Sequence, residues 1–254
     1  MGVWAAQLGG DAAWGLTADA RQSWGDHAFV VSVARRFRLP SLGERFVAPH
    51  LRDGLTLAGN TNVGDEHSWE LGGRVESRTG GLVNVLSATG QRTQDPIAFL
   101  PDANQPSDWR VAQNGETASL WVLEDRLALD SRLGPLRYRL HGGVAWAAGD
   151  RVGFYRAVPE LRAVAGARVG AELFKGSSAL YVNAEWQHTA EREDYDGLVL
   201  PQYNVLNVII SARLIDAKLY VGLYNALDER YTTNSAYLMT PRTLVYGLAW
   251  ALFD

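Results

Sequence analysis

The chain has 254 residues, enough for one large domain or two small ones. Its formal net charge is −4, and no basic stripe with interleaved aromatic residues occurs, which argues against a nucleic-acid partner. Cysteine is absent, so disulfides and thiolate metal sites are excluded. Nine Trp, ten Tyr and 26 Gly are typical of a strand-rich protein outside the cytoplasm.

Apolar and polar residues alternate with a period of two along nearly the whole chain. Successive side chains of a strand point to opposite faces, so this pattern predicts strands with one apolar and one polar face. The pattern is less clean in two of the segments, where Glu124, Asp125 and Arg126 are consecutive. The predicted strands, with a partial one at 3–8, are 12–23, 26–38, 66–78, 81–98, 116–132, 136–148, 160–174, 178–190, 203–215, 218–231 and 242–253.

The last three predicted strands have the clearest apolar faces. Leu206, Val208 and Ile210 share one face of their strand, and no charge interrupts this face or those of the two strands that follow. A Lys or Arg facing lipid at the bilayer midplane costs about 2 to 4 kcal/mol, so an uninterrupted face favours a membrane-spanning strand. A half-buried strand of a soluble barrel or sandwich would explain the period alone.

The connections between strands fall into two length classes that alternate along the chain. The short ones are 23–26, 78–81, 133–136, 175–178 and 215–218, and the long ones are 39–65, 98–115, 147–159, 189–202 and 231–241. Short turns on one rim and long loops on the other are typical of outer-membrane barrels. The sequence therefore predicts an all-β fold, an antiparallel transmembrane β-barrel meander of about 11–12 strands.

Several short motifs resemble segments of the TonB-dependent receptor family of Gram-negative outer membranes. The segment Phe-Arg-Leu-Pro-Ser-Leu-Gly-Glu-Arg-Phe begins at Phe37, Gly-Asn-Thr-Asn-Val begins at Gly59, and Trp-Glu-Leu-Gly begins at Trp69. Near the end, Tyr-Asn-Ala-Leu-Asp-Glu-Arg-Tyr begins at Tyr224, and Pro241 precedes an Arg where the family's last strand opens. The motif residues expected to have structural roles are Phe37, Pro40, Ser41, Glu44, Asn60, Glu70, Asn225, Asp228, Tyr231 and Arg242.

The resemblance covers nearly the whole chain but only part of the family's architecture. Such receptors are implied to have a 22-stranded barrel around an N-terminal plug, with a short box that binds TonB. Residues 1–254 resemble the C-terminal half of that barrel, with no plug domain. The implied location is the outer membrane of a Gram-negative bacterium. The implied partners are outer-membrane lipid, the barrel-assembly machinery, and the TonB system only through a missing plug and box.

The final residues depart from the family pattern. Aligning Arg242 with the family places Leu252 at the position of its final Phe and leaves Phe253 and Asp254 as an extension. This difference bears on recognition by the barrel-assembly machinery.

The function implied by the resemblance is TonB-dependent uptake of a bulky, scarce solute such as an iron–siderophore complex or another metal chelate. Two alternatives stay open: a plugless passive pore, and a barrel half completed by another chain. No enzyme is predicted, since the five His do not fall at metal-ligand spacing and no nucleophile motif occurs. No resident cofactor or metal site is predicted either.

Candidate ligand-binding residues lie in the long loops. Arginine side chains beside aromatic rings could engage an anionic chelate, and the candidates are Arg45, His50, Arg52, Trp109 and Arg110. Solvated loop residues with no ligand are the alternative interpretation. Glu124, like Glu70 of the motif set, is expected on the inner wall.

Overall fold

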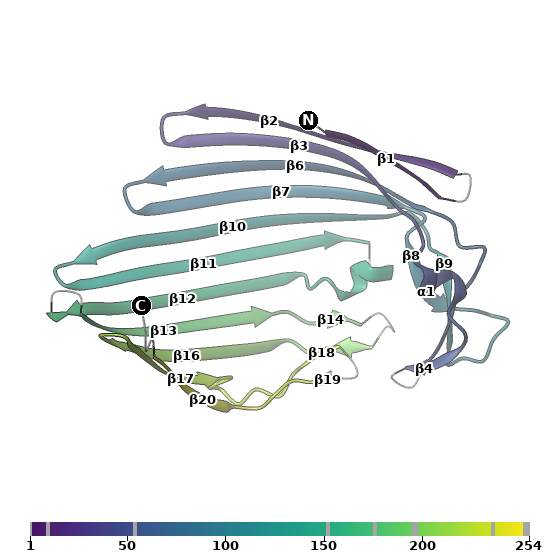
Figure 1. Ribbon diagram of the computed structural model, residues 1–254. Helices are drawn as coiled ribbons and strands as arrows, with labels where there is room; N and C mark the ends of the chain where they lie inside the picture. The colour runs from purple at the N-terminus through teal and green to yellow at the C-terminus, as the bar shows by residue number, and fades with distance from the viewer. Residues whose placement is uncertain are drawn as a thin grey trace.

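The computed structural model describes residues 2–8, 11–52, 55–150, 153–174, 177–194, 198–234 and 237–250. Twelve strands form one antiparallel sheet in which each strand pairs with its neighbours in sequence order, β1-β2-β3-β6-β7-β10-β11-β12-β13-β16-β17-β20 (Figure 1). The predicted all-β meander is confirmed, and the segment at 3–8 is a full strand rather than a partial one.

The strand bounds follow the alternating segments of the sequence closely. They are β1 Gly2–Leu8, β2 Asp11–Trp24, β3 His27–Arg38, β6 Glu66–Thr79, β7 Leu82–Gln94, β10 Ala118–Leu133, β11 Leu136–Gly149, β12 Leu161–Leu173, β13 Ser178–Thr189, β16 Tyr203–Leu214, β17 Ala217–Tyr224 and β20 Thr243–Trp250.

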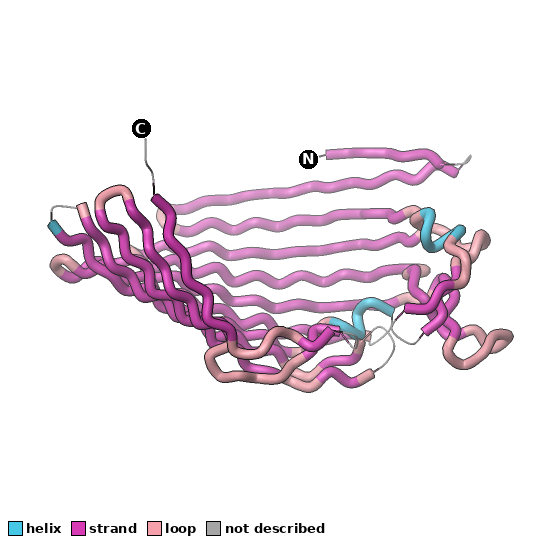
Figure 2. Tube along the Cα trace, turned by 60° about the horizontal axis from the view of Figure 1, so that its bottom comes forward, coloured by secondary structure: helices cyan, strands magenta, loops and turns pink. Residues whose placement is uncertain are grey.

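The sheet curls into an open trough, and the turned view of Figure 2 shows the strands running lengthwise along its wall. Among the described residues, no ladder joins β1 to β20, and the two strands lie apart in both views (Figures 1 and 2). In the part of the chain that the structure describes, no helix is long and apolar enough to cross a bilayer.

The two faces of the sheet differ in polarity as predicted. Residues directly opposite in an antiparallel pair share a face, and the register places Val33 opposite Leu71 and Leu123 opposite Trp146. This outer face leaves large apolar side chains uncovered, with Leu71 56% and Trp121 58% exposed. An apolar surface of this extent marks a contact with protein or membrane.

The opposite, inner face carries charged side chains in cross-strand pairs. Arg21 pairs with Glu76 at 3.2 Å and Arg36 pairs with Glu70 at 3.4 Å. Such exposed pairs contribute about 0 to 1 kcal/mol each. Their main consequence is a hydrated wall that alternates in charge.

The short and long connections are sorted to opposite rims. The tight turns after β2, β6 and β10 lie at the left end of the sheet in Figure 1, and the long connections lie at the right end. Gly25, Gly80 and Gly134 adopt φ values of 55°, 58° and 58° in these turns, a region that glycine enters without steric cost. The predicted sorting of loops is confirmed.

The long loops hold more regular structure than the sequence predicts. A four-stranded sheet has the order β4-β5-β9-β8, and the remaining loop elements are short. Their bounds are α1 Leu42–Phe46, β4 His50–Arg52, β5 Leu55–Ala58, β8 Ile97–Pro101, β9 Trp109–Asn114, η1 Gly153–Ala157, β14 Arg192–Glu193, β15 Val199–Leu200, β18 Thr232–Asn234 and β19 Tyr237–Leu238.

Two predicted strand ends are wrong. The strand expected over 81–98 ends at Gln94, because Asp95 takes a φ of 52° and the chain leaves the sheet before β8. The strand expected over 218–231 ends at Tyr224, where Asn225 and Asp228 adopt positive φ values. Leu252, Phe253 and Asp254, where the sequence differs from the family's C-terminal pattern, lie outside the described residues.

Candidate functional site

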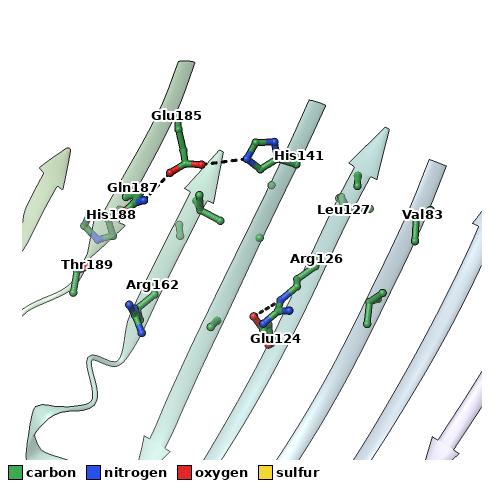
Figure 3. A pocket seen from close by; sticks show the side chains of 17 residues that line it. Val83, Glu124, Arg126, Leu127, His141, Arg162, Glu185, Gln187, His188 and Thr189 are labelled. Atoms are coloured by element: carbon green, nitrogen blue, oxygen red, sulfur yellow. Dashed lines mark hydrogen bonds and ion pairs between the residues drawn. The ribbon is translucent and has the colours of Figure 1, made fainter. Parts of the chain in front are cut away.

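A hollow of about 640 Å³ lies on the inner wall across β7, β10, β11, β12 and β13 (Figure 3). The register places its polar side chains on one face, because Glu124 is opposite Ala145 and Ala145 is opposite Arg162. The polar residues that line it are Glu124, Arg126, His141, Arg162, Glu185, Gln187, His188 and Thr189.

The charges in this hollow are mostly paired. His141 Nε2 lies 3.5 Å from Glu185 Oε2, and Gln187 Nε2 donates a 2.8 Å hydrogen bond to Glu185 Oε1. Arg126 Nε donates to Glu124 Oε1 at 2.6 Å. Figure 3 shows Arg162 on the same wall without an ion pair to the residues drawn. Among the described residues, the Arg162 guanidinium has no ion pair, so the hollow offers one cation that its own acidic groups do not engage.

A glycine directly opposite His141 makes room for the imidazole. A Cβ added to Gly166 would lie 2.2 Å from the His141 ring, so the ring occupies the space that a side chain would fill. The same arrangement recurs where Tyr181 covers Gly170. Aromatic rings that cover glycines in this way pin the register of a sheet. Gly166 therefore holds His141 toward Glu185.

Replacing Gly166 with Ala is expected to displace His141, separate it from Glu185 and lower the free energy of unfolding by about 1 to 3 kcal/mol. The control is Gly73→Ala, because a Cβ at Gly73 meets no atom within 4 Å and both glycines lie in strands. Urea unfolding of the two variants in detergent micelles measures the difference. Equal unfolding midpoints would contradict the proposed role of Gly166.

At the long-loop rim, a charged network ties α1 and β8 to the barrel strands. Arg38 Nη1 donates to Glu44 Oε1 at 2.8 Å, and Arg38 Nη2 donates to Glu66 Oε2 at 3.1 Å. Glu66, only 9% exposed, also accepts from the backbone N–H of Ile97 at 3.0 Å. The network joins the ends of β3 and β6 to the first residue of β8, so it positions both long loops.

Helix α1 begins with a capping box. Ser41 Oγ accepts from the Glu44 backbone N–H at 3.2 Å, and Glu44 Oε2 accepts from the Ser41 backbone N–H at 2.7 Å. Partial burial acts to raise the pKa of Glu44, but the hydrogen bonds from Arg38 and Ser41 outweigh it and lower this pKa from its ordinary value. Two motif residues of the sequence, Ser41 and Glu44, thus lie in the contacts that fix the loop.

The loop residues predicted to bind a ligand are partly brought together. Strand β5 pairs in parallel with β9, with Thr56 opposite Trp109, so loop 39–65 and the loop around Trp109 meet in one small sheet. Arg110 Nη1 donates to the carbonyls of Ser107 and Trp109 at 2.9 and 3.0 Å. Arg45 is half-buried in α1, and its Nε lacks a hydrogen-bond partner. The side chains of the other two candidates, His50 and Arg52, lie outside the described residues.

Asn225 and Asp228 bond neighbouring backbone where β17 ends. Asn225 is 4% exposed, its Oδ1 accepts from the Glu229 backbone N–H at 3.0 Å, and its Nδ2 donates to the Glu229 carbonyl at 2.9 Å. Asp228 Oδ1 accepts from the Arg242 backbone N–H at 2.9 Å. These contacts close the loop that leads into β20, and Tyr231 stacks on Tyr203 beside it at 4.3 Å between ring centroids.

Three further motif residues also have defined surroundings. Asn60 Nδ2 donates to the Ala112 carbonyl at 3.0 Å, which links the loop after β5 to β9. Pro40 is buried and follows the end of β3, while Phe37 lies within β3 opposite His67. These positions belong to strand ends and loop anchors rather than to the hollow.

Alternation along the sequence puts Arg162 and Glu185 on the polar faces of their strands but does not group them with His141. The three residues lie in different strands, and alternation gives the face of a residue without its height in the sheet. The registers that set Gly166 opposite both His141 and Glu185 bring them together. Because β12 separates β11 from β13, no pattern within one strand or one hairpin signals that His141 and Glu185 meet.

Comparison with known proteins finds a match at the level of fold. No protein-family model matches the chain. No curated protein sequence matches it either. Among solved structures, the copper transporter OprC superposes with a TM-score of 0.71 and 17% identity, covering 94% of this chain and 39% of that one. The siderophore receptor PirA from Pseudomonas aeruginosa gives 0.66 and 14%, covering 93% and 42%. The FrpB iron transporter from Neisseria meningitidis gives 0.62 and 13%, covering 94% and 39%.

The names of these structures describe them as transporters and receptors. The chain spans about two fifths of their length. The twelve-stranded sheet has the fold of part of the barrel wall of TonB-dependent receptors. The similarity of fold defines the architectural class of the chain.

Proposed function

We propose that this chain forms part of the barrel wall of a TonB-dependent receptor in the outer membrane of a Gram-negative bacterium. The receptor would take up a bulky, scarce solute, such as an iron–siderophore complex or another metal chelate. The supporting observation is the sheet itself. It combines an uncovered apolar outer face, a charged inner face and long loops gathered at one rim, in a fold shared with structures named for copper, iron and siderophore transport.

The outer face supports the membrane location. Leu140, Val144 and Trp146 lie on the same face of β11 and are 43%, 49% and 51% exposed. In water such a surface would remain hydrated at a cost of about 25 cal/mol per Å² of apolar area, and acyl chains remove that cost. The barrel-assembly machinery would insert such a wall, and outer-membrane lipid would cover it.

The charged groups support an anionic solute. Arg162 in the hollow, Arg45 in α1, and Arg110 next to Trp109 in β9 could engage an anionic chelate through charge-assisted hydrogen bonds and ring stacking. In this proposal residues 1–254 supply barrel wall and loops. Coupling to TonB acts through a plug and a TonB box that these residues do not resemble.

The experiment has two readouts, location and uptake. Density-gradient fractionation of cells that express the chain is expected to place it with the outer membrane, resistant to extraction by alkaline carbonate. Deleting the gene is expected to reduce growth on a limiting ferric siderophore or copper source, with recovery on complementation. Recovery of the chain in the soluble fraction would refute the membrane location, and unchanged growth on every chelate tried would refute the uptake role.

The solved structures named above do not favour a passive pore, since all are receptors or transporters. Liposome swelling separates the two functions. A chain that acts only as receptor wall is expected to admit no small sugars, whereas a pore would admit them.

A further inference from the structure

Two arginines lie on the apolar outer face, at the long-loop end of the sheet. The register places Arg35 of β3 directly opposite Trp69 of β6, and Trp69 directly opposite Arg92 of β7. Trp69 is two residues from Leu71 of the outer face, so the three side chains share that face and one height. In the twelve barrel strands as the structure describes them, the ladders place every other Lys and Arg on the inner face. We name Arg35, Trp69 and Arg92 the outer cationic row.

The outer cationic row lies at the level of lipid headgroups. On the outer face of β10, Trp121 marks one aromatic level, and Ser131, opposite Tyr138 of β11, marks the other. Ten residues at about 3.4 Å each, tilted by about 40°, give roughly 25 Å between these levels, which is the height of a lipid-facing apolar band. Arg92 is opposite Ser119, beyond Trp121 on the long-loop side, so it lies outside this band. Because the long loops of outer-membrane barrels are extracellular, the row meets the outer leaflet.

The protein does not neutralise the charge of this row. Arg92 is exposed, and among the described residues it has no hydrogen bond or ion pair. Asp150, whose Oδ2 accepts from the Ser119 backbone N–H at 2.7 Å, therefore leaves Arg92 unpaired. Arg35 Cζ lies 6.0 Å from the centroid of the Trp69 ring, a cation–π contact that keeps the positive charge in place. Trp69 is 48% exposed and adds an indole N–H donor. Two cations and one neutral donor thus face the headgroup layer.

Small residues form a shallow apolar strip next to the row, on the side of the membrane interior. Gly90 is opposite Leu71, and Ala88 is opposite Gly73, all on the outer face of β6 and β7. A Cβ added at Gly73 would meet no atom within 4 Å, so the wall is open there. The ring of Trp121 covers Gly90 and is 58% exposed, which gives the strip an aromatic border. Acyl chains have room to lie here directly beneath a headgroup held by the row, and this favours a lipid over a free anion.

We infer that the outer cationic row binds the phosphorylated headgroup of one lipid of the outer leaflet. A guanidinium donates two parallel hydrogen bonds to a phosphate, and basic clusters at the membrane surface attract anionic lipids. Adjacent strands lie about 4.8 Å apart, so the backbones at Arg35 and Arg92 are separated by about 10 Å, and both long side chains can reach one headgroup above Trp69. Anchoring at the interface alone would not require both outer-face cations in a single row. The inference rests on the membrane location proposed above.

The lipid that stays bound to the full chain gives the first test. Native mass spectrometry of the chain, extracted from Gram-negative cell membranes in a mild detergent, is expected to show one phosphorylated lipid per chain. Combining Arg35→Gln with Arg92→Gln is expected to lower the lipid-bound fraction by about tenfold or more. Arg36→Gln is the matched control, because Arg36 is adjacent to Arg35 but faces inward and pairs with Glu70 at 3.4 Å. This control is expected to retain the lipid within about twofold of the unsubstituted chain.

Titration of the delipidated chain in detergent separates the sources of phosphate. The probes are lipid A, which is a diphosphorylated glycolipid, phosphatidylcholine, whose headgroup has no net charge, and inorganic phosphate. Lipid A is expected to bind the unsubstituted chain at least about tenfold more tightly than either other probe, and to lose this preference in the double variant. Its binding is expected to weaken as salt is raised, because salt screens exposed charges. The preference of the unsubstituted chain tests the inference even if a variant fails to fold.

Four results would each overturn the inference. They are an unsubstituted chain without phosphorylated lipid, equal retention in the double variant and in Arg36→Gln, equal binding of phosphatidylcholine, which would mean ordinary interfacial contact, and equal binding of inorganic phosphate, which would mean a free anion. Fractionation of the same cells distinguishes this failure from that of the proposed function. A membrane-bound chain that retains no phosphorylated lipid refutes only the headgroup site.

Discussion

Arginine in place of Ile210 is expected to lower the free energy of unfolding by about 2 to 4 kcal/mol in lipid vesicles. Ile210 lies on the outer face of β16 and is 47% exposed, opposite Val182 and Val221, so a guanidinium there would have to remain in the hydrocarbon layer. Urea-induced unfolding in vesicles of short-chain phosphatidylcholine measures the change.

The matched control for Ile210→Arg is the adjacent Ser211→Arg. Ser211 is opposite Tyr181 and Tyr220 on the inner face, where a guanidinium keeps access to water and to the faces of aromatic rings. A cost below about 1 kcal/mol is expected for this variant. If the two substitutions cost the same, the outer face does not meet lipid and the membrane assignment of the sheet is wrong.

Removal of the Arg38 side chain is expected to have the second large effect, about 3 kcal/mol or more of local stability at the long-loop rim. Arg38→Ala removes the charged partner of the buried Glu66 carboxylate, which keeps its hydrogen bond from the Ile97 N–H. Breaking one side of a buried charge pair costs about 3 to 5 kcal/mol. We place the expectation at the low end because the Arg38 side chain is itself 42% exposed.

Hydrogen exchange of the amides in α1 and β8 measures the Arg38→Ala effect, and protection is expected to fall there while β11 and β12 keep theirs. Arg36→Ala is the control, since Arg36 lies two residues away on the same strand and pairs with Glu70 at 3.4 Å across a hydrated face. That exposed pair contributes about 0 to 1 kcal/mol. Equal loss of protection in both variants would show that the network does not anchor the loops.

The strands were predictable because each one carries its own signal. The alternating face of Leu206, Val208 and Ile210 falls within β16, and its bounds differ from the prediction by one residue at the C-terminal end. Gly-containing turns such as that at Gly134 gave the hairpins by local chemistry alone. A meander pairs neighbours in sequence, so local elements were enough to give the topology.

The loop sheet and the end of β7 were not predictable in the same way. Strand β5 pairs in parallel with β9, about fifty residues later, and no short-range pattern announces a contact between distant segments. Asp95 ends β7 by adopting a positive φ, which few residues other than glycine do. The sequence therefore gave no sign of a break, and the apolar residues at 97–100 were assigned in part to the same strand.

The sequence by itself determined that this protein is a meander of strands with one apolar and one polar face, because face and turn depend on residues close together in the chain. Only the tertiary structure decided which side chains lie next to one another on those faces. The register of adjacent strands brings His141 to Glu185 over Gly166 and turns Asp125 outward beside Asn84. Register depends on pairing across strands. The three consecutive charged residues at 124–126 do not show by themselves which of them faces outward. The ladders of β10 with β7 and β11 settle this and place Asp125 on the apolar face.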